Sequence, residues 1–82
     1  TRDLVMGLRL VWDDPADAAE FAAEYPAYPA ALYGVAGAPG PDGSTCWSGG
    51  DVICFMQNGG ESFIVRGPDL TTATAVLTAL RS

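Results

Sequence analysis

The chain has 82 residues, which suits one small domain, and its 49% hydrophobic and 17% charged residues argue against disorder. A net charge of −6, with no lysine and dispersed arginines, argues against nucleic-acid binding, which needs clustered cations. The absence of histidine and lysine also removes the commonest general base, the commonest metal ligand and Schiff-base chemistry.

Both ends of the sequence look cut. The chain begins at Thr1 without an initiator methionine and ends at Ser82 on a predicted helix, and it holds no signal peptide. No run of about 18 apolar residues is long enough to span a bilayer. We therefore expect residues 1–82 to be a single domain excised from a longer extracytoplasmic protein, with no membrane insertion by this segment.

Residues 4–12 predict a strand, in which Leu8 and Leu10 share one face. Asp13-Asp14-Pro15 then predicts the start of a helix, because aspartate accepts a backbone N–H and proline suits the first helical position. We expect this helix to end before Pro26. Its apolar stripe consists of Ala18, Phe21, Ala22 and Tyr25.

The next segment is rich in turn-forming residues. Pro29 is expected to open a single helical turn that ends at Leu32. Residues 34–44 hold four glycines and two prolines without periodicity, and we interpret them as a connecting loop, with a binding loop as the alternative.

Residues 45–66 contain two turn signals, which divide them into three predicted strands. Centring the first turn on Gly50 places Cys46 opposite Cys54, at the close approach of a non-hydrogen-bonded pair. Centring the second turn on Gly59 places two phenylalanines opposite each other on the core face. The pairs in that register are Phe55–Phe63, Ile53–Val65, Cys54–Ile64 and Met56–Ser62.

A second helix is predicted after Gly67-Pro68-Asp69, with Asp69 as its cap. Its apolar stripe consists of Leu70, Ala73, Val76, Leu77 and Leu80. The order strand, helix, three strands, helix predicts an α+β domain, in which a small antiparallel sheet carries two helices packed on one face.

The two cysteines are interpreted as a structural disulfide between Cys46 and Cys54. Their spacing differs from a Cys-x-x-Cys redox pair, and two thiols without histidine make a poor zinc site. Two free buried thiols are the alternative. A disulfide predicts an extracytoplasmic protein that is secreted, periplasmic or anchored at the cell surface.

The carboxylates do not form a catalytic or metal-binding pattern. Most of them are explained by helix caps, by the solvent face of the first helix or by turns, so none has the apolar surroundings of a glycosidase acid. Asp42 and Asp51 are candidate calcium ligands, but they lack the Asp-x-Asp-x-Asp-Gly spacing. We predict no catalytic, cofactor-binding or metal-binding residue.

The remaining candidate features concern surface contacts. Trp47 is a candidate ligand contact next to Cys46, with packing against the disulfide as the alternative. The central strands are apolar on both faces, so two helices on one face leave the other face exposed as an apolar patch. Such a patch predicts a protein partner, through self-association as a dimer or docking onto the rest of the parent chain.

The motif Trp-Asp-x-x-x-Asp-Ala-x-x-Phe, at Trp12 to Phe21, precedes a Gly-Asp hairpin with strands at residues 51–56 and 62–67. This arrangement resembles small domains of uncharacterised secreted or lipid-anchored bacterial and archaeal surface proteins. The resemblance implies a location at the cell surface, such as in a lipoprotein, and no activity.

These observations together predict a non-enzymatic extracytoplasmic module for interaction or assembly. The alternative is a domain that binds a small ligand or glycan through Trp47 and the segment Gly34–Ser44.

Overall fold

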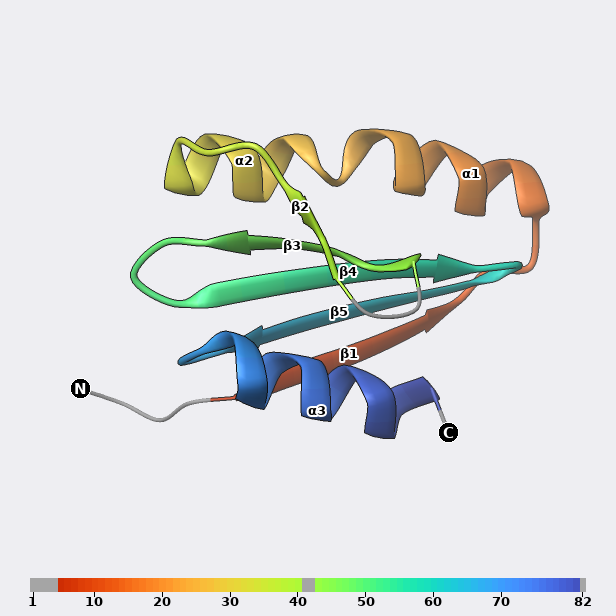
Figure 1. Ribbon diagram of the computed structural model, residues 1–82. Coiled ribbons are helices and arrows are strands. Elements are labelled where there is room, and N and C mark those ends of the chain that lie inside the picture. Colours follow the sequence, from red (N-terminus) through yellow and green to blue (C-terminus); the bar gives the residue numbers. More distant parts are fainter. Residues whose placement is uncertain (1–4, 41–42, 82) are drawn as a thin grey trace.

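The computed structural model describes residues 5–40 and 43–81, which form a five-stranded antiparallel sheet between two layers of helix (Figure 1). The elements are β1 (Met6–Val11), α1 (Pro15–Glu24), α2 (Ala27–Tyr33), β2 (Ala38–Pro39), β3 (Thr45–Ser48), β4 (Val52–Asn58), β5 (Glu61–Gly67) and α3 (Leu70–Arg81). In the sheet the strands follow the order β1-β5-β4-β3-β2. The predicted α+β class and antiparallel sheet are confirmed.

The two long helices begin at the predicted caps. The Asp14 carboxylate accepts a hydrogen bond from the backbone N–H of Ala16 at 2.8 Å, at the start of α1. The Asp69 carboxylate accepts from the backbone N–H of Thr72 at 2.7 Å, at the start of α3. Each side chain satisfies one of the N–H groups that a helix leaves unpaired in its first turn. Helix α1 ends ahead of Pro26, as expected.

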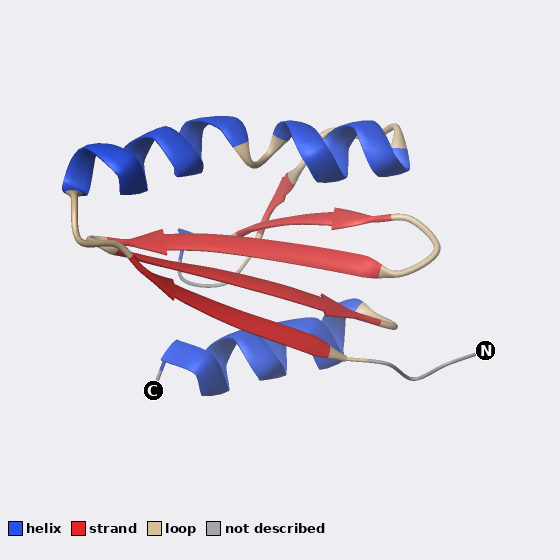
Figure 2. Cartoon of the chain, turned by 180° about the vertical axis from the view of Figure 1, so that it is seen from behind, coloured by secondary structure: helices blue, strands red, loops and turns tan. Residues whose placement is uncertain are grey.

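The helices lie on both faces of the sheet, so the expectation that they share one face is wrong. Figures 1 and 2 show α1 and α2 above the sheet and α3 below it. The core under α1 and α2 contains Trp47, Ile53, Phe55 and Ile64. The core under α3 contains Cys46, Val52, Cys54, Met56, Phe63, Val65, Ala73 and Leu77. Because the central strands are apolar on both sides, each side needs its own helical cover.

The segment predicted as one turn and a loop has more structure than expected. Helix α2 runs from Ala27 to Tyr33, because a proline in the first turn gives up an N–H that needs no partner there. The helix ends at Gly34, whose φ of 68° is left-handed. Ala38–Pro39 then adds β2 to the sheet beside β3.

The register of the first hairpin is confirmed, and that of the second is wrong by one residue. Cys46 lies opposite Cys54 in the β3–β4 pair. In the β4–β5 pair, however, Asn58 lies opposite Glu61, which leaves a two-residue turn at Gly59 and Gly60 instead of three residues. The observed pairs are Phe55–Ile64, Ile53–Arg66, Cys54–Val65 and Met56–Phe63. The shift moves Phe63 to the face under α3, since neighbouring residues of a strand point to opposite faces.

Candidate protein-interaction surface

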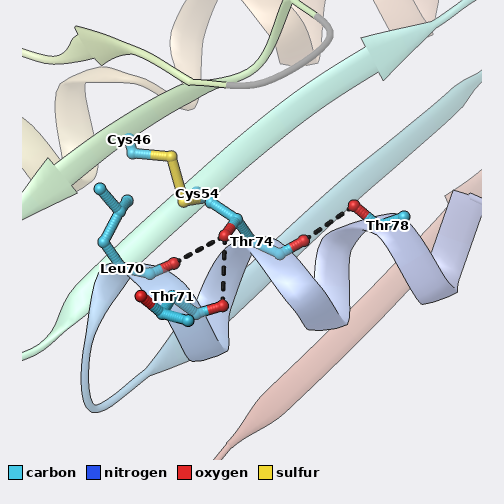
Figure 3. Close-up of a disulfide and its surroundings, with 6 residues drawn as sticks. All are labelled: Cys46, Cys54, Leu70, Thr71, Thr74 and Thr78. Carbon is cyan, nitrogen blue, oxygen red and sulfur yellow. Dashed lines mark hydrogen bonds between the residues drawn. A yellow bond between two sulfur atoms is a disulfide. The ribbon is translucent and has the colours of Figure 1, made fainter.

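The two cysteines form a disulfide between β3 and β4. Cys46 and Cys54 have Cα atoms 4.1 Å apart, and both residues are buried in the core under α3. Figure 3 shows the disulfide above the first turns of α3, where the Thr74 hydroxyl donates to the carbonyl oxygen of Leu70 at 2.9 Å. The predicted pairing is confirmed. Its place in the core indicates that the bond stabilises the fold, as expected of proteins in oxidising compartments.

Trp47 lies in the core on the other face of the sheet. Only 2% of its surface is exposed, and it packs with Ile53 and Phe55 under α2. The segment before β2 covers the indole so closely that a Cβ atom added at Gly37 would lie 2.9 Å from the ring nitrogen. The ring therefore contacts protein rather than solvent, and a ligand could reach it only if residues 34–40 moved.

The carboxylates serve the roles that the sequence suggests, with two additions. Those of α1 and the turn before it are exposed, namely Asp13, Asp14, Asp17, Glu20 and Glu24. Glu61 forms an ion pair with Arg9 across β1 and β5. Asp51 forms an ion pair with Arg66. Asp42, the other candidate calcium ligand, lies outside the described residues.

Tyr33, Asp51 and Arg66 form a polar cluster that joins α2 to the sheet. The Tyr33 hydroxyl donates to one oxygen of Asp51, and the Arg66 Nε donates to the other oxygen at 2.5 Å. The three residues come from α2, the turn between β3 and β4, and β5. The tyrosine ring also packs on Gly49, where an added Cβ would lie 2.2 Å from it. The cluster therefore fixes the end of α2 over the first hairpin.

The cluster shifts the pKa values of its members in directions that keep it intact. Burial, followed by the hydrogen bond to Asp51, raises the pKa of Tyr33 to about 12. Hydrogen bonds from Arg66 and then Tyr33 hold the pKa of Asp51 below its usual value. At neutral pH Tyr33 is thus a protonated donor and Asp51 a charged acceptor. This arrangement suits a structural contact, because neither group is poised to exchange a proton near pH 7.

The sequence contains the members of this cluster but the predicted register conceals it. In the predicted register Ile53 faces Val65, which turns Arg66 toward the opposite face from Tyr33. The observed register pairs Ile53 with Arg66, and Asp51 stands two residues before Ile53 on the same face. Asp51 and Arg66 are opposite charges at diagonal positions of an otherwise apolar strand pair, and this pattern is the signal in the sequence that could have indicated the cluster.

The exposed apolar residues lie at the edge of the sheet and not on its central strands. Both faces of the central strands are covered, so the predicted apolar patch on them is absent from the described part of the chain. On β1, by contrast, Met6 is 50% exposed, Leu8 42% and Val11 67%. Within the described residues β1 pairs with β5 alone and ends the strand order. We call the outer side of Met6–Val11, with these side chains, the β1 edge surface.

The hydrogen bonds around β1 show which backbone groups point outward. The N–H of Trp12 donates to the carbonyl oxygen of Gly60 at 2.8 Å, on the β5 side. Because backbone groups of successive residues alternate between the two sides of a strand, Leu8 and Leu10 also turn theirs toward β5. Gly7, Arg9 and Val11 therefore direct their N–H and C=O groups away from β5, as a template for another strand.

None of the helices in residues 5–40 and 43–81 is long and apolar enough to cross a membrane. A family model described as a domain of unknown function, DUF8575, matches residues 1–77. No curated protein and no solved structure matches the chain.

Proposed function

The chain belongs to the DUF8575 family, a domain of unknown function, and we propose that it is a non-enzymatic extracytoplasmic interaction module that binds a protein strand along the β1 edge surface. The observation that carries the proposal is the six-residue edge strand β1, with exposed apolar side chains and outward backbone groups. Proteins usually shorten such an edge or protect it with charged side chains or proline; β1 has no proline, and its one charged side chain, Arg9, is paired with Glu61. Strand addition uses this kind of edge, with backbone hydrogen bonds giving affinity and side chains giving specificity.

The extracytoplasmic location is supported by the disulfide, because reducing compartments disfavour such bonds. The resemblance of residues 12–21 to secreted or lipid-anchored surface proteins supports the same location. A thiol-blocking assay on intact cells tests it. We expect the native protein to resist alkylation at Cys46 and Cys54 until it is reduced, whereas full alkylation without reductant would contradict the location.

The non-enzymatic part of the proposal is supported by the use of the polar side chains. Asp51, Arg66 and Tyr33 bind one another, and Glu61 pairs with Arg9. Ligand binding through Trp47 is disfavoured by the burial of its indole. The sheet edge is the better candidate because it is accessible without any rearrangement.

Site-specific photo-crosslinking in the native host tests the interaction. A photoreactive phenylalanine analogue at Val11 is expected to form protein adducts, and the same analogue at the exposed Ala23 of α1 is the control. Arg9→Pro should abolish the adducts, because it removes an outward N–H without removing a β1–β5 hydrogen bond. Arg9→Ala is its matched control, since it loses the same side chain and keeps the N–H. Equal adduct yields at Val11 and Ala23, or yields that Arg9→Pro leaves unchanged, would refute the proposal.

A further inference from the structure

We infer that the strand which pairs with the β1 edge surface is β1 of a second copy of this chain, antiparallel and centred on Leu8. This inference rests on the proposed function and names its partner. A two-fold axis perpendicular to the sheet relates two such strands, and each residue on the axis faces its own copy. The two sheets then join into one, with α1 and α2 of both copies on the same side.

The outward backbone groups select the register. Val5, Gly7, Arg9 and Val11 have the parity that points away from β5. With Leu8 on the axis, Val5 lies opposite Val11 of the second copy and Gly7 lies opposite Arg9. Every outward residue then belongs to a hydrogen-bonded pair, and each such pair exchanges two hydrogen bonds. Centring on Arg9 would place Val5 opposite Asp13, beyond the end of β1, and centring on Gly7 would place Val11 opposite residue 3, which lies outside the described residues.

The side chains favour the same register. Centring on Leu8 places Leu8 opposite Leu8 and Met6 opposite Leu10 of the second copy, all on the face covered by α1 and α2. The exposed apolar side chains of the two edges therefore cover one another. Centring on Arg9 instead opposes two arginines, which is unfavourable.

On the α3 face this register opposes Arg9 to a glycine. Gly7 carries no side chain, but Leu80 and Val76 of α3 fill the space above it, so the arginine of the second copy turns away from that helix and keeps its own ion pair with Glu61. Helix α3 packs on β5 and β4 as well as on β1. A Cβ at Gly7 would lie 3.1 Å from Leu80, so the glycine also lets α3 sit close to the edge strand.

Charge determines how the association responds to salt. Each copy has a net charge of −6, while Arg9 is the only charged residue of β1. The copies therefore repel one another at long range, although the strands that meet carry no carboxylate. Salt screens this repulsion, since the Debye length falls from about 30 Å at 0.01 M to about 10 Å at 0.1 M. We expect the dissociation constant to fall several-fold over that range.

Disulfide trapping tests the register. With Leu8 on the two-fold axis, the two copies of residue 8 form a non-hydrogen-bonded pair, as Cys46 and Cys54 do between β3 and β4. Leu8→Cys should therefore form a disulfide-linked dimer under mild oxidation. Leu10→Cys is the control, because residue 10 lies far from its own copy in this register. A mixture of Met6→Cys and Leu10→Cys should give the mixed dimer well above either homodimer. Peptide mapping must show Cys46–Cys54 intact in each product.

Sedimentation equilibrium of the unmodified domain tests the association itself. We expect a dimer that Arg9→Pro dissociates and Arg9→Ala retains. Self-pairing is overturned if the domain is monomeric at millimolar concentration in 0.5 M salt and the yield of covalent dimer from Leu8→Cys is no higher than that from Leu10→Cys. If adducts at Val11 in cells then contain a different protein, the edge binds another chain and the proposed function stands. If no adducts form in cells either, the proposed function fails as well.

Discussion

Breaking the Cys46–Cys54 disulfide is expected to lower the free energy of unfolding in two separable steps. The bond closes a loop with a sequence separation of 8, for which the chain-entropy relation gives about 2.5 kcal/mol at 25 °C. Reduction alone removes this contribution and leaves both sulfur atoms in the core. Replacing both cysteines by alanine also removes the packing of two buried sulfur atoms, which adds about 1.5 kcal/mol. The total free energy of unfolding of a small domain is only about 0.05–0.15 kcal/mol per residue, so either change removes a large fraction of the stability.

Urea unfolding followed by far-ultraviolet circular dichroism measures both steps. The oxidised protein, the same protein in a phosphine reductant and the Cys46→Ala/Cys54→Ala variant are compared at one temperature. The reduced protein separates loss of the cross-link from loss of packing, because its composition is unchanged. A reduced protein within 0.5 kcal/mol of the oxidised one would show that the loop-entropy reasoning is wrong for this hairpin.

Three further outcomes follow from the polar cluster and the cover over Trp47. The pKa of Asp51 is lower in the folded state than in the unfolded chain, where it is about 4. The stability that the charged carboxylate contributes is therefore present above the unfolded pKa and is lost as the pH falls through the folded pKa. Acid unfolding of Asp51→Asn should accordingly show a shallower dependence of stability on pH. Because the pKa of Tyr33 is raised to about 12, the folded state holds its proton more tightly, so stability should decrease from pH 10 to pH 12. Burial also raises the pKa of Tyr25, so spectrophotometric titration should show two late-ionising tyrosines, of which Tyr33 ionises earlier in Asp51→Asn. Gly37→Ala should destabilise the fold by about 1–3 kcal/mol, because its Cβ would crowd the indole of Trp47. In the control Gly50→Ala the new Cβ meets nothing within 4 Å, so the free energy of unfolding should change by no more than about 0.5 kcal/mol. Equal effects of the two variants in thermal unfolding would contradict the packing described for residues 34–40.

Local signals predicted most of the elements and the first hairpin. The caps Asp14 and Asp69 locate two helix starts, because a side-chain acceptor for orphan N–H groups is a short-range property of the chain. The pairing of Cys46 with Cys54 follows from the turn between them, which requires no knowledge of the rest of the fold.

The errors arose where distant parts of the chain decide the outcome. The turn at Gly59 and Gly60 accommodates two or three residues, and only packing against the helices selects the register that buries Phe63 under α3. The apolar stripe of α3 does not specify which face of the sheet the helix covers, because both faces of the central strands are apolar. The β1 edge surface was missed for a related reason, since the order of strands in the sheet is a property of topology. The apolar residues of β1 are also typical of a core strand, and only the outermost position of β1 in the sheet leaves them exposed.

The other edge of the sheet limits how far such an assembly can grow. Strand β2 has only two residues, and one of them is Pro39, whose nitrogen carries no hydrogen to donate. A chain with two adhesive edges polymerises into a continuous cross-β ribbon, whereas a chain with one adhesive edge closes after a single pairing. The short, proline-bearing strand would thus make the inferred two-copy complex a terminated particle rather than the seed of a filament.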